Sequence, residues 1–261
     1  MKPLFILFIT SFSMLPTGKH TDLVVPGIGT TNWVLERSRN KDSLQTIRFI
    51  NSSSLKNLPG VISDLSETFN ETIFRSGYLL GKEGFTVYLY VVTCNNAENA
   101  AAIKYRINDT MYHLKLNRFN QVADDKALAA TLIHEVMHCV LLNIYNRAKR
   151  EEWSAQNSIL NFGLNKNDSS YFFNNDFFVQ MNNGELGQHE LMYQLFYPQM
   201  VSLLKRFVSL HKKSFLIPGE AESLMWSGLQ QTNAFKKLPD DEKKSIVLTI
   251  LKAKGIATNE E

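Results

Sequence analysis

The sequence Thr-Leu-Ile-His-Glu-Val-Met-His-Cys occupies residues 131–139, near the middle of the 261-residue chain. Apolar residues surround it on every side of a helical wheel from Asp124 to Arg147, which predicts a long buried helix that begins at Asp124 or Asp125. His134 and His138 are four residues apart, so they lie on one face of this helix and can reach the same metal ion. Burial of two histidines and Glu135 without partners would be unfavourable, and a bound cation is the simplest partner.

A catalytic zinc site needs a third protein ligand and an open fourth position. We expect the third ligand from a second helix, which the apolar pattern predicts over residues 185–212 with an interruption at Pro198. His189 lies at the centre of the apolar stripe of this helix, which is formed by Met192, Phe196, Met200, Leu203 and Phe207. Glu190 lies at the edge of the stripe and is the alternative third ligand. If Glu190 or Glu185 filled the fourth position, the site would be closed and structural.

Several shorter patterns place other elements around these two helices. Strands are predicted at 46–50, 85–94, 103–107 and 111–117, and helices at 59–78 and from Pro239 to Lys254-Gly255. The strand at 85–94 is apolar on both faces and is therefore expected at the centre of a sheet, whereas 103–107 and 111–117 form a hairpin at its edge. We thus predict an α+β fold. A small mixed sheet with an edge hairpin packs on the central motif helix, and a mainly helical C-terminal part follows.

The first residues are expected to be removed from the mature protein. Met1 and Lys2 precede an apolar run, residues 3–15, which is too short to span a bilayer and is typical of a signal peptide. Cleavage could occur after Ser11-Phe12-Ser13 or at Thr17-Gly18, and the second site gives a signal peptide at residues 1–17 and a domain at residues 18–261. Within it, residues 18–147 hold the sheet and the motif helix, and residues 148–261 hold the third ligand. Because no later run of eighteen apolar residues occurs, we expect export without a stable membrane span.

Composition excludes several classes of protein. The 28 Lys and Arg residues nearly balance 25 Asp and Glu residues, which leaves a formal charge of +3 and argues against a nucleic-acid partner. Cys94 and Cys139 are the only cysteines, so a zinc site made of cysteines alone is excluded. In an exported protein the two could form a disulfide or remain buried thiols. The sequence indicates no oligomeric state.

The motif helix, the preceding sheet and the later helix resemble the zincin metallopeptidases in their gluzincin-like arrangement. More narrowly, residues 131–135 (TLIHE), 188–192 (QHELM) and 226–229 (WSGL) resemble poorly characterised secreted HExxH proteins of Bacteroidetes-type bacteria. The likeness covers roughly residues 86–255, and only the first block is specific. Gluzincins usually carry a glutamate as third ligand, so His189 departs from their pattern and Glu190 stays open.

The resemblance implies an exported zinc metallopeptidase that acts on a peptide or protein substrate. His134, His138 and His189 would bind Zn²⁺, and Glu135 would act as general base on the zinc-bound water and then pass the proton to the leaving amine. Tyr193 or Tyr197 would stabilise the oxyanion.

Two further segments are expected to lie near the site, and one alternative function remains open. The strand at 111–117 would receive the substrate by strand addition. Trp226 is expected to be buried, anchoring a loop over the two helices. The alternative function is that of a catalytically inactive, zincin-like binding or structural protein with a zinc-stabilised core.

Overall fold

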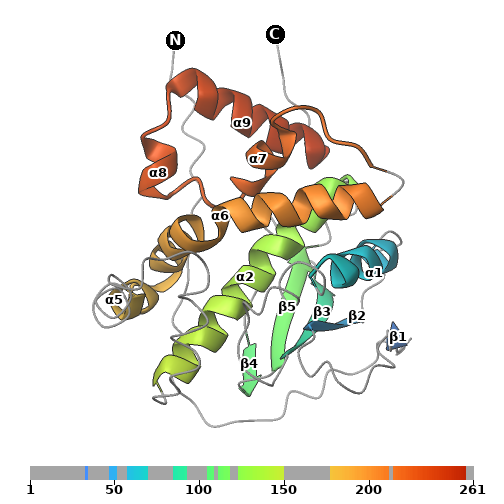
Figure 1. The fold of residues 1–261 in the computed structure, drawn as a ribbon, viewed down its shortest axis with the longest axis vertical. Coiled ribbons are helices and arrows are strands. Elements are labelled where there is room, and N and C mark those ends of the chain that lie inside the picture. Colours follow the sequence, from blue (N-terminus) through green and yellow to red (C-terminus); the bar gives the residue numbers. More distant parts are fainter. Residues whose placement is uncertain are drawn as a thin grey trace.

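The computed structural model describes residues 33–34, 47–51, 58–69, 85–92, 105–108, 111–117, 123–149, 177–211 and 214–256 (Figure 1). The predicted signal peptide, residues 1–17, lies outside these ranges, and so does Cys94. Cys139 is buried, and the two alternatives, a disulfide with Cys94 or two buried thiols, both stay predictions. The division of the chain at residues 17 and 147 likewise stays a prediction.

The strands form one sheet. They are β1 (Trp33–Val34), β2 (Ile47–Asn51), β3 (Phe85–Val92), β4 (Tyr105–Asn108) and β5 (Met111–Asn117), in the order β1-β2-β3-β5-β4. The strand predicted to be central is confirmed as such, because β3 pairs in parallel with β2 on one side and with β5 on the other. The hairpin is also confirmed, since β4 and β5 pair antiparallel. The prediction that residues 111–117 form an edge for a peptide is wrong, because β5 is paired on both sides and β4 takes the edge.

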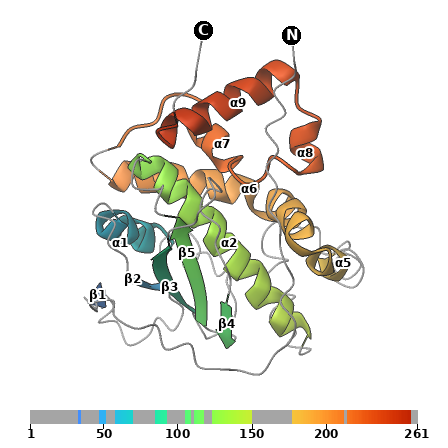
Figure 2. The ribbon, with the colours of Figure 1, turned by 180° about the vertical axis from the view of Figure 1, so that it is seen from behind.

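The helices surround the motif helix. They are α1 (Leu58–Phe69), α2 (Asp125–Lys149), α5 (Phe178–Asn182), α6 (Gly184–Leu210), α7 (Glu220–Met225), α8 (Asn233–Lys236) and α9 (Asp240–Ala253). Helix α6 crosses α2, and α7, α8 and α9 gather on the side of α6 that faces away from the sheet in both views (Figures 1 and 2). The motif helix thus lies between the sheet and a C-terminal group of helices.

The prediction of an α+β fold built on a small mixed sheet needs correction. The part of the chain whose side chains are described is 79% helical, and the described helices α6, α1, α7 and α9 all contact α2. The reason is that α2 is apolar on every side, so one sheet could cover only part of its surface. Helices cover the rest, and the surroundings of the motif are mainly helical.

Helix α2 begins where the sequence predicts. The Asp124 carboxylate accepts a hydrogen bond of 2.7 Å from the backbone N–H of Ala127, which is the bond of an N-terminal capping residue. A 22-residue stretch of this helix, residues 125–146, is long and apolar enough to span a membrane, but its most apolar window is 94% buried inside the protein. Its hydrophobicity is therefore that of a core helix.

Helix α6 runs without a break through Pro198, so the predicted interruption is wrong. Pro198 lies on the exposed side of the helix, away from the buried stripe, where the missing N–H donor interrupts one hydrogen bond without ending the helix. The apolar stripe is confirmed: each of its members is at most 1% exposed, namely Met192, Phe196, Met200, Leu203 and Phe207. A continuous α6 keeps His189 in a fixed rotation relative to this buried stripe.

His211 ties three helices together at the end of α6. Its Nδ1 atom lies 2.6 Å from Asp64 of α1, and its Nε2 atom lies 2.8 Å from Asp125 in the first turn of α2. Burial of His211 lowers its pKa, but the hydrogen bonds to the two carboxylates outweigh this effect, so the pKa is raised. A protonated His211 thus fixes the start of α2 against α1 and the end of α6.

Candidate metal centre

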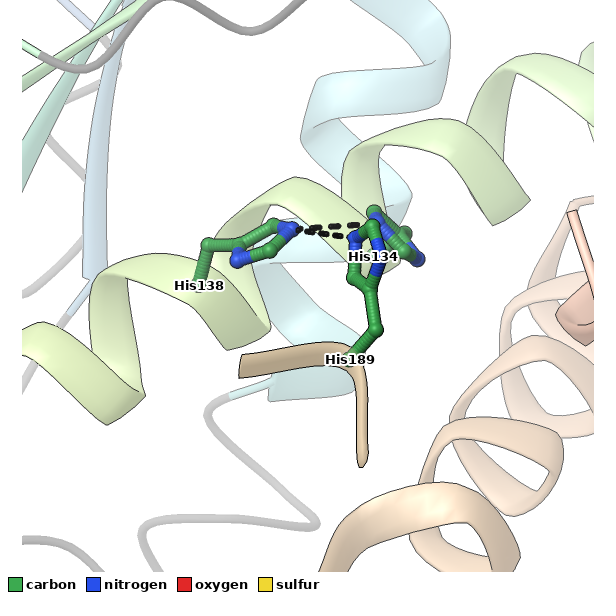
Figure 3. A group of neighbouring side chains, drawn as sticks. All are labelled: His134, His138 and His189. Carbon is green, nitrogen blue, oxygen red and sulfur yellow. Dashed lines mark hydrogen bonds between the residues drawn. The ribbon is translucent and has the colours of Figure 1, made fainter. Parts of the chain in front are cut away.

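Three histidines from two helices meet inside the protein (Figure 3). His134 and His138 project from successive turns of α2, and His189 approaches them from α6. The Nε2 atom of His138 lies 3.2 Å from that of His134 and 3.1 Å from that of His189. The three side chains are buried, with exposed fractions of 6%, 2% and 6% for His134, His138 and His189.

These distances fit a single metal ion. Zinc holds imidazole nitrogens at about 2.0–2.1 Å in a tetrahedral arrangement, which places neighbouring nitrogens about 3.3 Å apart. The ligand atoms of the three histidines all lie within 4.8 Å of one another. Three imidazole nitrogens that converge on one buried point present lone pairs that a cation satisfies together. The cluster, with its His-Glu-x-x-His spacing, is compatible with a zinc site.

Gln188 orients one of the rings. Its side-chain Oε1 lies 2.9 Å from Nδ1 of His138, on the opposite side of the ring from the other histidines. With the proton on Nδ1, the ring donates to Gln188 and leaves the Nε2 lone pair facing the shared point. Outer hydrogen bonds of this kind fix the tautomer and rotation of metal-binding histidines.

Glu190, which follows His189, and Glu185, one helical turn before it, occupy different places. The structure brings His189 to the histidine pair, whereas the Glu190 carboxylate accepts a 2.6 Å hydrogen bond from the backbone N–H of Asn233 at the start of α8. Glu185 lies one turn before His189, with its Oε1 atom 3.8 Å from His189 Nε2 and its side chain 38% exposed. Glu185 is therefore beside the centre but outside the group of mutually close ligand atoms.

Glu135 is buried next to the histidines, with 8% of its surface exposed. Lys254, at the end of α9, lies close enough to Glu135 for the charge of the carboxylate to affect the pKa of the lysine. Burial lowers the pKa of Lys254 to about 8, and the negative charge of Glu135 acts in the opposite direction. A 2.9 Å hydrogen bond from the Asp124 N–H to the Ala253 carbonyl holds the end of α9 against the start of α2. The sequence interpretation did not identify this lysine.

The two candidate tyrosines belong to an aromatic cluster around Trp226. Tyr193 stacks on Trp226 with ring centroids 5.1 Å apart, and Tyr197 lies 4.9 Å from the same ring. The Tyr197 hydroxyl donates a 2.9 Å hydrogen bond to the Glu222 carbonyl. Burial raises its pKa well above the usual value, with a smaller contribution from the charge of Glu222. Tyr197 is thus engaged with the α7 backbone, and Trp226 is buried as predicted.

Two residues that contact the histidines, Gln188 and Gly228, were not predicted from the sequence as part of the site. Gln188 could have been considered because it precedes His189, and a metal-binding histidine needs a partner for its other nitrogen. Gly228 lies against the ring of His134, and its only signal was its place in the Trp226–Leu229 segment. Both depend on how distant parts of the chain meet.

Comparisons of the chain with protein-family models, with curated proteins and with solved structures find no match. A buried set of three histidines can hold a divalent ion and leave one position for another molecule.

Proposed function

We propose that the protein is an exported zinc-dependent metallopeptidase that hydrolyses peptide bonds. The observation that carries the proposal is the convergence of three imidazole Nε2 atoms beside a buried glutamate: His138 Nε2 lies within 3.2 Å of its counterparts on His134 and His189, and Glu135 follows His134 directly.

Each residue of the centre has a separate task. His134, His138 and His189 would hold the ion. When bound, zinc polarises a carbonyl group and lowers the pKa of a water molecule to about 7. Glu135 takes a proton from the attacking water and delivers it to the departing amine. Lys254, at the end of α9, places a positive charge near Glu135.

The donor set supports catalysis over a structural role. Structural zinc sites are usually closed by four protein ligands, whereas catalytic sites keep three and an open position. In the described part of the chain, the group of mutually close ligand atoms contains three histidines and no fourth side chain. A purely structural site would also have no use for Glu135. The alternative is a zinc-stabilised binding protein, which would bind zinc without cleaving peptides.

Export and the peptide substrate rest on the sequence. The short apolar run behind Lys2 supports a signal peptide, and the resemblance to zincins supports the amide bond as target. The interior position of β5 removes one route by which a peptide could have added to the sheet. The part of the substrate that flanks the cleaved bond must therefore be held elsewhere.

The test is the variant Glu135→Gln, assayed for zinc content and for cleavage of a peptide library. We expect one zinc per chain in both proteins and a loss of cleavage of at least about 100-fold in the variant, because general acid–base catalysis contributes 10²–10⁴-fold. Glu67→Gln, an exposed carboxylate on α1, is the matched control and should behave like wild type. Wild-type protein that binds zinc but cleaves no peptide, or a Glu135→Gln variant as active as wild type, would contradict the peptidase proposal.

A further inference from the structure

The turn that follows α7 lies directly on the metal centre. Gly228 has a backbone φ of +89°, in the region that favours glycine. A Cβ atom at this position would lie 2.6 Å from Cε1, 2.9 Å from Nε2 and 3.1 Å from Nδ1 of His134. These distances place the added Cβ over the face of the imidazole at Cε1, so the backbone of Gly228 packs on that face and any side chain at this position would collide with the ring.

The turn is held firmly on both sides of Gly228. Trp226 is 6% exposed and packs on Tyr193, and Leu229 is fully buried. Backbone hydrogen bonds link Ser227 to Leu224 at 3.0 Å and Leu229 to Trp226 at 2.9 Å. Phe235 adds an edge contact to the Trp226 ring at 5.3 Å between centroids. Because these contacts fix the turn, a side chain added at position 228 would displace the ring of His134 and leave the turn in place.

We propose that Gly228 is a positioning residue that keeps His134 Nε2 directed at the metal. The backbone of the turn closes one side of the imidazole, and the missing side chain leaves the ring room for the rotation that points Nε2 toward His138 and His189. A methyl group at position 228 would collide with the His134 ring, and rotation of the ring would relieve that collision. The same rotation takes Nε2 of His134 away from the Nε2 atoms of His138 and His189. This inference rests on the metal site of the proposed function.

The decisive variant is Gly228→Ala, compared with Gly219→Ala. Gly219 also has a positive φ, +78°, but a Cβ atom there would meet nothing within 4 Å. The two substitutions therefore impose similar backbone strain, and only the first meets His134. We expect zinc affinity, measured by competition with a chromophoric chelator, to fall 10- to 100-fold in Gly228→Ala, as for the loss of other outer contacts of a metal ligand. Gly219→Ala should bind zinc as wild type does.

The visible spectrum of the cobalt(II)-substituted proteins adds a readout that a purely structural role would not move. A displaced His134 should change the ligand-field bands in Gly228→Ala and leave those of Gly219→Ala unchanged. If the zinc affinity and the cobalt spectrum of Gly228→Ala equal those of Gly219→Ala, the inference is overturned. Wild-type protein that binds no zinc would instead remove the proposed function, so the two failures are distinguishable.

A double-mutant cycle keeps the inference testable if Gly228→Ala proves too unstable for metal titration. Removing the ring removes the collision, so in zinc-free protein Gly228→Ala should lower the melting temperature less in a His134→Ala background than in wild type. The reduced effect should match that of Gly219→Ala. An equal loss in both backgrounds would show that the added methyl group does not collide with His134.

Discussion

The Oε1 atom of Gln188 lies 2.9 Å from Nδ1 of His138, a residue 50 positions earlier in the chain. Gln188 directly precedes His189, whose own ring lies 3.1 Å from the same imidazole at Nε2. One turn of α6 thus supplies both a neighbour for the metal-facing nitrogen of His138 and an acceptor for its other nitrogen. The rotation of α6 about its axis determines both contacts.

Replacement of Gln188 by Ala should weaken zinc binding about 10- to 100-fold, because His138 loses the acceptor that fixes its tautomer and ring orientation. Chelator competition measures the change, and circular dichroism checks that the fold persists. Gln194→Ala, at an exposed position of the same helix, is the control and should leave affinity unchanged. Equal affinities for the two variants would show that Gln188 does not support the centre.

Replacement of Glu190 by Ala should reduce stability and leave zinc affinity unchanged. The carboxylate is 8% exposed and accepts the Asn233 N–H at 2.6 Å, and loss of a buried hydrogen bond to a charged group costs about 1.5–3 kcal/mol. Urea unfolding of the zinc-free protein measures the cost, and Glu190→Gln, which keeps an acceptor oxygen, should recover part of it. Loss of zinc in Glu190→Ala would transfer the role of third ligand to this residue.

The local part of the site could be predicted from the sequence, and the contacts between distant segments could not. His134 and His138 meet because a helix places residues four apart on one face, and the buried stripe of α6 gave His189 its inward direction. Gln188 and Gly228 act through the angle at which α6 and the 226–229 turn reach α2. No periodicity within one element encodes that angle.

The errors in the fold prediction have similar causes. Strand patterns located β2, β3 and the β4–β5 hairpin, but they did not indicate that β4 would take the edge position beyond β5. The helical share was underestimated because the apolar surface of α2 indicated burial without identifying the covering elements. Pro198 predicted an interruption, yet a proline on the exposed side of a long helix removes one donor and leaves the buried stripe intact.

The stability of the zinc-free protein should depend on the protonation of His211. Its pKa is raised in the folded state by Asp64 and Asp125, so the folded protein retains the proton longer than the unfolded chain does. The resulting stabilisation is complete below the unfolded pKa of about 6.5 and is lost as the pH rises through the folded pKa. Urea unfolding of wild type and His211→Gln across pH 5.5–9 should give free energies that converge with rising pH. A constant difference would contradict the ion-pair account.

Lys254 should have the opposite effect on stability at higher pH. Burial lowers its pKa to about 8 from the ordinary lysine value of 10.5, so the folded protein releases this proton before the unfolded chain does. The free energy of unfolding of wild type should therefore rise relative to Lys254→Met as the pH increases from about 8 to about 10.5. Lys244→Met, at an exposed position of α9, is the control. Wild-type and Lys254→Met curves that run parallel over this range would show that Lys254 titrates normally.

The account depends most directly on His189 as the third ligand, and zinc titration of His189→Ala tests it. We predict one tightly bound zinc per wild-type chain by metal analysis and a loss of affinity of at least about 100-fold in His189→Ala. His211→Gln, a substitution at a buried histidine away from the centre, should keep wild-type affinity in the pH range where it remains folded. A His189→Ala protein that binds zinc as tightly as wild type would contradict the three-histidine centre.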